Sequence, residues 1–301
     1  MKIDMNSLSN LTVVILTYKT DFQILKNCIQ LIESSVKIKI IENSSNFKDQ
    51  DYFLNNFPNI TVHCTNQNLG FGAGNNYGLS LLDTKYGLVL SPDTVCDENF
   101  FKKIRHYLNE ELDYTIIGSS YKDDKVYAAY GFFPENIKKK DDYKSPNSSL
   151  LKVDWVVGCC MLLNLEKFDK QKIFDENFFL YFEEFNLCKK LSLKNENVFS
   201  SKDLLISHLG FKSSFSPNPL LREEVNKLRE WHWMWSMFYF YRNNYGYFFA
   251  FKKTISKLLK YSIKTVYFSF TFNKVLKNKF KCRFLGLLCS MLGKKSSFRI
   301  D

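Results

Sequence analysis

The chain has 301 residues, and its 42 Lys and Arg against 31 Asp and Glu give a formal net charge of +11. With 45% hydrophobic and 17% aromatic residues but only 12 glycines and 6 prolines, it is too apolar for a disordered chain and too poor in glycine and proline for a fibrous one. The charge is concentrated at one end. Residues 246–301 contain 13 Lys and Arg and one acid, which leaves 29 basic and 30 acidic residues in the first 245. The composition therefore predicts a nearly neutral globular body with a basic tail.

The eight cysteines form no Cys-x-x-Cys pair, and the N-terminal residues contain no apolar stretch typical of a signal peptide. We therefore expect reduced thiols packed as small hydrophobic side chains in a cytosolic protein. The sequence also lacks a run of about 18 uncharged apolar residues, so no membrane-spanning helix is expected.

In the first hundred residues, uncharged runs rich in β-formers alternate with segments of helical spacing. The runs have the pattern of buried parallel strands and lie at residues 11–18, 36–41, 60–64 and 86–90. Helices are expected at residues 22–32 and from the glycine-rich segment to about residue 82. This order predicts an α/β fold with a parallel sheet. Polar residues follow several strands, at the edge where open α/β sheets bind ligands.

After residue 100 the pattern is less regular. The expected elements are strands at 114–118, 125–133 and 204–208, a loop at 134–149 and a helix at 178–191, and residues 153–163 form a further apolar run. From residue 220 onward the signal is helical and includes the aromatic stretch 231–241. We therefore expect a catalytic domain over residues 1–215, an aromatic helix at 216–245 that packs on it, and a basic amphipathic tail at 246–301.

The glycine cluster Gly70, Gly72 and Gly74 resembles a dinucleotide-binding fingerprint only superficially. It follows the third strand instead of the first, and Asn75 stands where the third glycine belongs, so that interpretation is rejected. Two interpretations stay open. Either the backbone approaches a ligand closely while Asn68 and Asn75 supply amide donors, or the glycines form a tight turn before a helix.

Four titratable side chains lie at predicted element ends. Asp93 follows an uncharged strand, where it could bind a divalent cation or cap the next helix. Glu183 and Glu184 are adjacent acids in a predicted helix after a very apolar stretch. They fit a helix dipole, and they equally fit a general base whose pKa is raised by apolar surroundings and a neighbouring carboxylate. His208 ends the last predicted strand, where it is either a ligand or an ordinary core or surface residue.

Eight segments occur in a characteristic order: VVILTY (13–18), ENSS (42–45), NLGFGAGNN (68–76), SPDT (91–94), WVVGCCMLL (155–163), FDENFFLYFEEFNLCKK (174–190), SHLG (207–210) and YRNN (241–244). Together they resemble family 2 glycosyltransferases, in particular the rhamnosyltransferase-like branch of bacterial polysaccharide enzymes. The resemblance spans about residues 11–245. It implies a GT-A fold, a nucleotide-binding α/β domain that uses a nucleotide-diphosphate sugar and Mg²⁺ or Mn²⁺.

The resemblance also implies roles for single residues on the donor side. The donor-binding positions are Thr17, Tyr18, Glu42, Asn68, Gly70, Asn75, Ser91 and Asp93. Asp93 corresponds to the metal-binding acid of the family's DXD-type motif, and His208 to a histidine near the diphosphate and metal. Glu42 departs from the pattern because it replaces the usual aspartate.

On the acceptor side, the resemblance assigns the catalytic carboxylates to Glu183 and Glu184, with Glu184 as the base, and places Trp155 and Gly158 beside the acceptor. Glu184 stands where the family has aspartate, and Asn186 replaces a further acid. A glutamate base is one methylene longer, so the acceptor hydroxyl must lie slightly farther from the helix.

The predicted activity is an inverting transfer of L-rhamnose from dTDP-L-rhamnose, or of another hexose, to a growing bacterial surface glycan. A sugar nucleotidyltransferase is an alternative, although the expected Lys- or Arg-bearing glycine loop near the first strand is missing. A nucleic-acid-binding protein that uses the basic tail is another. The tail's lysines alternate with apolar residues at helical spacing, which favours an anionic membrane surface over nucleic acid, with a solvated lysine-rich helical pair as the remaining possibility. On the inner face of the cell membrane, a glycan on polyprenyl diphosphate would be a suitable acceptor.

Overall fold

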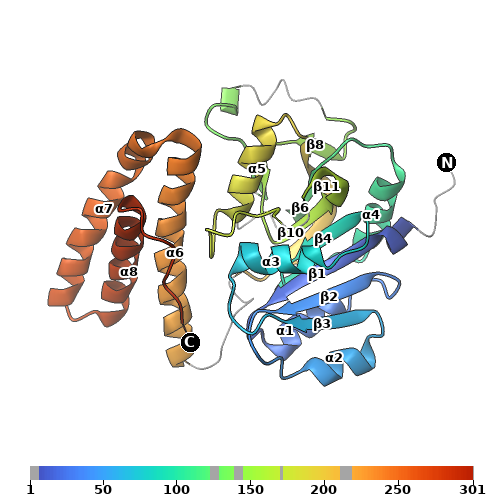
Figure 1. Cartoon of the computed structure of the whole chain (residues 1–301), viewed down its shortest axis with the longest axis horizontal. Coiled ribbons are helices and arrows are strands. Elements are labelled where there is room, and N and C mark those ends of the chain that lie inside the picture. Colours follow the sequence, from blue (N-terminus) through green and yellow to red (C-terminus); the bar gives the residue numbers. More distant parts are fainter. Residues whose placement is uncertain (1–6, 123–128, 139–144, 170–171, 211–218, 301) are drawn as a thin grey trace. The chain divides into compact units, whose positions relative to one another are not determined.

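The computed structural model describes the chain except for residues 1–6, 123–128, 139–144, 170–171, 211–218 and 301 (Figure 1). Its contacts divide the chain into two compact units. The first, here called the sheet unit, comprises residues 1–69, 73–174 and 187–215. The second, the helical unit, comprises residues 70–72, 175–186 and 216–301. Two short internal segments therefore belong with the C-terminal helices.

Within its described residues, the sheet unit contains a nine-stranded mixed sheet, with eight strands in the order β3-β2-β1-β4-β10-β6-β11-β5. The first four strands of this order are mutually parallel. They are β3 (Ile60–Cys64), β2 (Lys37–Glu42), β1 (Leu11–Thr17) and β4 (Tyr86–Leu90). In the register, Ile15 of β1 lies between Ile40 and Leu90. The predicted parallel α/β sheet and its first four strands are confirmed.

Helices cover both faces of this sheet. The helices that share one hydrophobic core with Val13 and Ile15 are α1 (Phe22–Ile29), α2 (Gln50–Asn56) and α4 (Phe100–Asn109), joined by the short 3-10 helix η1 (Ser7–Asn10). Helix α3 (Phe71–Ser80) lies on the opposite face, because a Cβ on its Gly78 would lie 2.6 Å from Val14 Cγ1. β1 is therefore buried on both sides, which explains its uncharged sequence.

The remaining strands extend the sheet beyond β4. They are β10 (Cys160–Asn164), β6 (Ile116–Tyr121), β11 (Val198–His208), β5 (Thr94–Cys96) and β8 (Leu150–Lys152). β10 is antiparallel to both β4 and β6, whereas β11 is parallel to β6 and antiparallel to β5 and β8. β7 (Tyr130–Gly131) and β9 (Trp155–Val156) form a separate two-stranded sheet. The carboxyl ends of β1, β4, β6 and β11 therefore meet at one edge.

Several predicted boundaries in this region are wrong. The apolar run at 153–163 contributes to two sheets, because β9 pairs with β7 in the small sheet and β10 joins the large one. The last strand starts at residue 198 instead of 204, with a register shift between Ser200 and Leu205. The strand expected at 114–118 begins at Ile116. Parts of the expected strand 125–133 and loop 134–149 lie outside the described residues.

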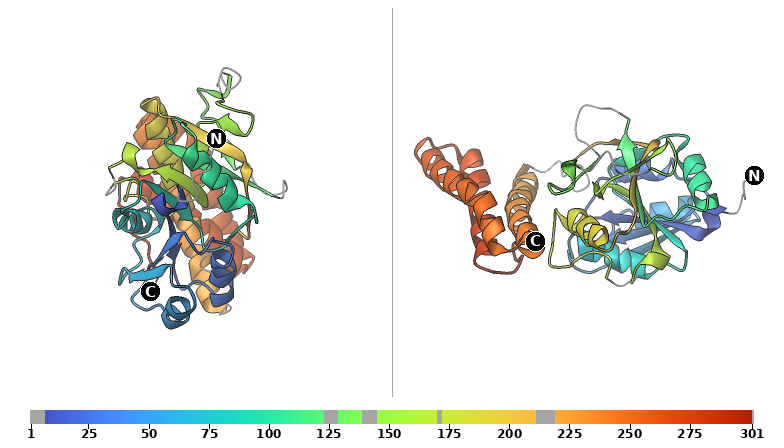
Figure 2. Two further views of the ribbon diagram at one scale, coloured as in Figure 1. Left: turned by 90° about the vertical axis from the view of Figure 1, so that its right-hand side faces the viewer. Right: turned by 90° about the horizontal axis from the view of Figure 1, so that it is seen from above.

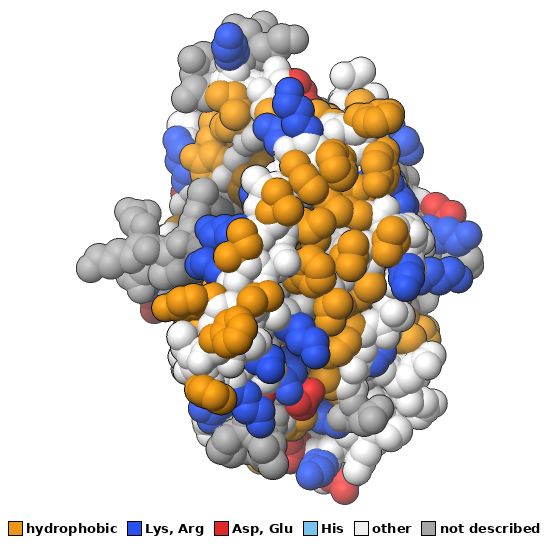
Figure 3. Space-filling model, turned by 90° about the vertical axis from the view of Figure 1, so that its left-hand side faces the viewer, with side chains coloured by type: hydrophobic (Ala, Val, Ile, Leu, Met, Phe, Trp, Pro, Cys, Tyr) orange, Lys and Arg blue, Asp and Glu red, His pale blue; other side chains and the backbone are white. Residues whose placement is uncertain are grey.

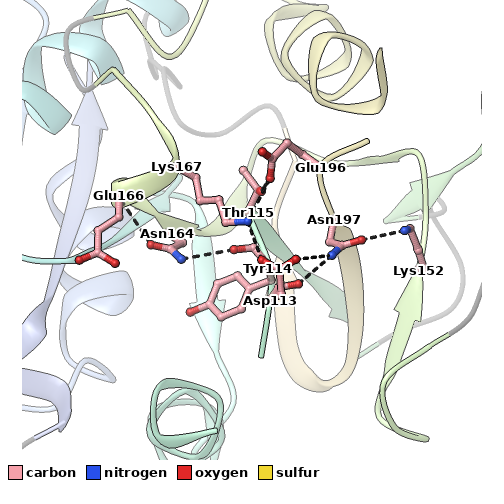
Figure 4. Close-up of polar contacts among 9 residues, drawn as sticks. All are labelled: Asp113, Tyr114, Thr115, Lys152, Asn164, Glu166, Lys167, Glu196 and Asn197. Atoms are coloured by element: carbon pink, nitrogen blue, oxygen red, sulfur yellow. Dashed lines mark hydrogen bonds and ion pairs between the residues drawn. The ribbon is translucent and has the colours of Figure 1, made fainter. Parts of the chain in front are cut away.

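A polar network lies at the edge opposite those carboxyl ends and ties β6, β10 and β11 together (Figure 4). It involves the 3-10 helix η3 (Leu165–Lys167), whose Lys167 pairs with Asp113 and Glu196. Asn197 donates to Asp113 and accepts from Lys152. The hydrogen bond from Lys167 lowers the pKa of Asp113, so this carboxylate is held in its charged form. The network fixes where β6 and β11 begin.

The helical unit contains the long helices α6 (Pro219–Tyr245), α7 (Tyr247–Phe270) and α8 (Lys274–Met291), which lie side by side (Figures 1 and 2). Their shared core includes Met234, Phe238, Ala250, Tyr261, Phe280, Leu287 and Met291. The segment after α8 folds back on α6, because Trp235 Nε1 donates to Lys294 O and the buried His232 contacts Phe298 O. None of the described helices combines the length and apolar character needed to cross a lipid bilayer.

Gly286 on α8 allows this helix to approach α6. A Cβ at this position would lie 2.1 Å from the backbone oxygen of Trp231, which has no rotamer with which to move away. We expect Gly286→Ala to lower the free energy of unfolding by about 1–3 kcal/mol, as overpacking does. Urea unfolding measures the effect. Leu285→Ala, which truncates a partly exposed neighbour, is the control and should change stability much less; equal effects of the two variants would contradict this role of Gly286.

Candidate active site

The ends of β1 and β2 are joined by the carboxylate of Glu42. This side chain is 1% exposed, and it accepts hydrogen bonds from Thr17 Oγ1 at 2.7 Å, Ser44 Oγ at 2.6 Å and the backbone N of Lys19 at 3.2 Å. Both carboxylate oxygens are therefore engaged within the chain. Two predicted donor residues, Thr17 and Glu42, are brought together here, and Tyr18 lies between Thr17 and the left-handed Lys19 (φ 49°).

The loop after β3 is attached to the same edge by an amide pair. Asn43 Nδ2 donates to Asn68 Oδ1 at 3.1 Å, and Asn43 Oδ1 accepts from Leu69 N at 3.0 Å and from Thr65 Oγ1 at 3.1 Å. Asn68 is one of the predicted donor residues, whereas Asn43 is not, although it lies in the ENSS segment. Its position directly after a buried strand was the available signal.

The glycine-rich segment has a structural role. Gly74 and Gly78 bring α3 against β1, and a Cβ on Gly74 would lie 2.6 Å from Leu16 Cδ1. Asn75 is buried, and the neighbouring Asn76 forms two hydrogen bonds of 2.9 Å with the backbone of Phe174. Of the three clustered glycines, Gly72 and Gly74 therefore lie within α3, and only Gly70 precedes the helix.

Gly70 belongs to the helical unit and has a φ of +83°, which favours glycine. A Cβ here would lie 2.2 Å from Phe179 O, and the same oxygen accepts a 2.8 Å hydrogen bond from Phe71 N. Gly70 therefore permits close contact with residues 175–186, the segment that contains the two predicted catalytic carboxylates.

Asp93 and His208 meet at the carboxyl-end edge of the large sheet. Asp93 lies between β4 and β5, is 2% exposed, and has its Oδ1 3.3 Å from His208 Nε2. β5 pairs with the end of β11, and Leu209 N donates to Asp93 O, so two strands fix this geometry. The ring of Tyr121, at the end of β6, stacks on His208 with centroids 6.2 Å apart.

The alternative role of Asp93 as a helix cap is wrong. β5 separates it from α4, whose N-cap is Asn99. Ser91 lies on the same turn, where its N–H donates to Cys159 O and its carbonyl accepts from Thr94 N. Burial and, second, the charge of Asp93 raise the pKa of the Cys28 thiol, which places that buried thiol near the same carboxylate.

The Asp93–His208 pair fits a divalent cation that takes most of its ligands from elsewhere. Adjacent ligands of an octahedral ion with bonds of about 2.1 Å lie about 3 Å apart, close to the observed 3.3 Å. A carboxylate oxygen and an imidazole nitrogen are suitable donors for Mn²⁺. The described part of the chain contains no group of three or more His, Cys, Asp and Glu that could hold a metal. Such an ion would therefore depend on phosphate and water oxygens.

The two residues predicted beside the acceptor lie around β9. Trp155 is half-buried and its ring packs on Gly131 of β7, where a Cβ would lie 2.3 Å from Trp155 Cζ2. Gly158 is buried in the turn that leads from β9 to β10. The small β7–β9 sheet thus fixes the position of the indole ring.

In the helical unit, Glu183 and Glu184 open helix α5 (Glu183–Leu193). Glu183 is 1% exposed, and its Oε1 has no hydrogen-bond partner among the described residues. Burial, and then the charge of Glu184, raise the pKa of Glu183 well above its usual range. Burial raises the pKa of Glu184 to about 7. Burial therefore favours the neutral form of Glu183, whereas Glu184 can exchange a proton near neutral pH.

The helix predicted at 178–191 begins only at Glu183 because the preceding backbone is not helical. Tyr181 and Phe182 have φ values of 70° and 71°, which bulky residues adopt only when their surroundings enforce them. Ser236 of α6 donates to Leu180 O at 2.8 Å, and Asn244 Nδ2 donates to Asn186 Oδ1 at 3.0 Å. Helix α6 thus forms hydrogen bonds to the chain both before and after the acid pair, and these hold the pair in place.

Aromatic rings complete this support. The ring of Tyr181 lies edge-on to Trp233 with centroids 5.0 Å apart, and Phe182 contacts Trp233 and Phe240. The guanidinium of Arg299 lies 3.7 Å from the ring centroid of Phe179. The aromatic stretch 231–241 is visible in the sequence, but its contact with the carboxylate segment is not, since the two are separated by about 50 residues.

Comparison with known proteins gives a family and a distant relative. Residues 12–171 match the family described as Glycosyl transferase family 2. The low-salt glycan biosynthesis hexosyltransferase Agl10 of Haloferax volcanii is 23% identical over 214 residues, which cover 65% of this chain and 66% of Agl10. The match thus spans just under two thirds of that relative.

Two solved structures share the fold. The mannosyltransferase PcManGT from Pyrobaculum calidifontis, in complex with GDP-Man and Mn²⁺, has a TM-score of 0.54 and 7% identity, covering 95% of this chain and 88% of its own. TarS of S. aureus has a TM-score of 0.50 and 12% identity, covering 73% and 39%. At such identities the likeness concerns the fold alone, and it confirms the predicted GT-A fold with a helical C-terminal region.

The Glu42 network makes a testable contribution to stability. We expect Glu42→Ala to lower the free energy of unfolding by about 1–3 kcal/mol, because it removes the acceptor of the Lys19 N–H and leaves the buried Thr17 hydroxyl only its longer contact of 3.3 Å with Ile41 O. Glu166→Ala is the matched control, since Glu166 forms an exposed ion pair with Lys85 and should contribute less than about 1 kcal/mol. Urea unfolding compares them, and a loss at Glu42 no greater than at Glu166 would refute the structural role.

Proposed function

Because the chain belongs to glycosyl transferase family 2, we propose that it transfers a hexose from a nucleotide-diphosphate sugar to a hydroxyl group of a glycan. The observation that carries this proposal is the Asp93–His208 pair at the carboxyl-end edge of the sheet. Ligands of open α/β sheets bind at this edge. The hexosyltransferase activity named for Agl10 and the GDP-Man bound to PcManGT support a nucleotide-hexose donor.

Mg²⁺ or Mn²⁺ is the proposed cofactor, with Asp93 and His208 as its protein ligands. When bound, such an ion would neutralise charge on the leaving diphosphate. The hydrogen-bonded ends of β1 and β2 and the Asn43–Asn68 pair form a rigid edge that suits the nucleotide. The donor sugar proposed from the resemblance is L-rhamnose on dTDP, and GDP-mannose is the alternative suggested by PcManGT.

Glu184 is the proposed general base. Its pKa of about 7 allows it to accept the proton of an acceptor hydroxyl near neutral pH. The acceptor oxygen would then bond to the anomeric carbon while the bond from that carbon to the diphosphate oxygen breaks and its electron pair leaves with the diphosphate. Attack from the face opposite the leaving group inverts the anomeric configuration. Glu183 is buried next to Glu184, and its raised pKa favours a neutral form that adds no second negative charge beside the base.

The donor and metal assignments are tested together by thermal unfolding with dTDP-rhamnose, GDP-mannose and UDP-glucose, each with and without Mn²⁺. A true donor should stabilise the protein, by about 2.7 kcal/mol when present at 100 times its Kd. We expect Asp93→Asn to remove the part of this stabilisation that depends on Mn²⁺. Asp83→Asn, which changes an exposed partner of Lys37, serves as the control. Full Mn²⁺-dependent stabilisation of Asp93→Asn would refute the metal assignment, and no response to any nucleotide sugar would refute the donor class.

The base assignment is tested with the donor identified in that screen. We expect Glu184→Gln to lower kcat by at least about 100-fold while donor binding persists, because the amide cannot accept the proton. In the unchanged protein, kcat/KM should fall about tenfold per pH unit below about 7 and level off above it, since only the deprotonated carboxylate acts as a base. The exposed Glu98→Gln is the control. Near-normal turnover by Glu184→Gln would transfer the role to another group.

A further inference from the structure

Helix α7 has two apolar faces. One face is buried in the helical unit through Ala250, Thr254 and Tyr261, which recur at spacings of four and seven residues. The other face carries exposed apolar side chains. These side chains are Phe248, Phe251, Leu259, Ile263, Val266, Tyr267 and Phe270, together called the α7 stripe below.

The C-terminal part of the α7 stripe, from Leu259 to Phe270, forms a continuous band. Leu259, Ile263, Val266 and Phe270 are spaced by four, three and four residues, so they lie on one side of the helix. Ile263 is 69% exposed and Phe270 is 79% exposed. The space-filling view of this side of the molecule shows hydrophobic side chains gathered along the face with Lys and Arg around them (Figure 3). Contiguous exposed apolar surface of this kind marks an interaction site.

The charged residues beside the α7 stripe indicate which kind of partner this surface binds. Helix α7 carries five lysines and no acid, and α8 adds four lysines and one arginine, of which Lys279 and Arg283 pair with Glu230 of α6. Lys253, Lys257, Lys260 and Lys264 are spaced by four, three and four residues, so they run along one flank of the helix. An apolar stripe with a lysine flank is the pattern of helices that lie in a membrane interface.

We propose that the α7 stripe lies on an anionic lipid bilayer, with its apolar side chains among the acyl chains and the flanking lysines at the phosphate headgroups. Bilayer lipids supply both the apolar layer and the negative charge that this surface requires. A second copy of the chain would satisfy the apolar side chains but would bring two acid-free lysine flanks together. A nucleic acid would satisfy the lysines but leave the aliphatic side chains exposed to water.

The test is flotation of the full chain with vesicles of phosphatidylcholine alone and of phosphatidylcholine with about 30% phosphatidylglycerol, a typical anionic surface. We expect binding to the anionic vesicles only. The double variant Ile263→Glu/Phe270→Glu should weaken it by roughly 10-fold or more, because two apolar anchors become charged. Leu193→Glu is the matched control: Leu193 is 70% exposed but lies at the end of α5 in the sheet unit, and this variant should bind as the unchanged chain does.

A second variant, Lys253→Ser/Lys260→Ser, tests the electrostatic contribution to vesicle binding separately. It should weaken binding to anionic vesicles and make the remaining binding less sensitive to salt. Thermal unfolding of each variant verifies that these surface changes leave the fold intact. Unchanged binding by the Ile263→Glu/Phe270→Glu variant, or equal binding to neutral and anionic vesicles, would overturn the proposal. So would a dimer in light scattering that this variant dissociates, or RNA binding that the variant leaves intact while no vesicle binding occurs.

Discussion

The helical unit holds two adjacent carboxyl groups, Glu183 and Glu184, whose surroundings disfavour their charged forms, and this constraint explains much of its structure. Burial and the neighbouring charge raise the pKa of Glu183, and burial raises that of Glu184 to about 7. Such a pair must be held in place, because the preceding Tyr181 and Phe182 occupy an unfavourable region of backbone conformation. The hydrogen bonds from Ser236 and Asn244 and the ring of Trp233 supply that support. The aromatic face of α6 therefore does more than fill a core.

The two edges of the large sheet hold their carboxylates in different ways. At the edge in Figure 4, Asp113 and Glu196 are kept ionised by lysine and hydroxyl donors, which favours a fixed, solvated structure. At the carboxyl-end edge, Glu42 is buried and engaged by donors of its own loops, so the backbone there is rigid before any ligand arrives. Asp93 and His208 are then positioned by strand pairing of β5 with β11. A rigid edge of this kind lowers the entropic cost of orienting a ligand.

The sequence was sufficient where local pattern and burial agree. The uncharged runs of β1, β2, β3 and β4 predicted the parallel sheet, and the ordered motifs predicted the GT-A fold. Prediction failed where tertiary contacts decide the boundary. No periodicity shows that residues 153–163 divide between two sheets, or that positive φ values at Tyr181 and Phe182 delay helix α5 to Glu183. The sequence placed Asp93 and His208 in one site only through the family resemblance, because the short strand β5 that pairs them has no signal of its own.

The excess of basic residues lies in the helical unit, where it must be explained together with the exposed apolar side chains of helix α7. A helix on the surface needs polar residues on the face that contacts water, and a fully buried helix needs apolar residues on both of its faces. Helix α7 satisfies neither condition, since its outer face is apolar and its flank is lysine-rich without a single acid to neutralise it. Lysine stems can lie along apolar surface while their ammonium groups reach a polar layer, which two-sided packing against protein would bury. The surplus of basic residues in the tail is thus coupled to exposed apolar area on the same helix, and only an environment that is apolar and negatively charged at once satisfies both features.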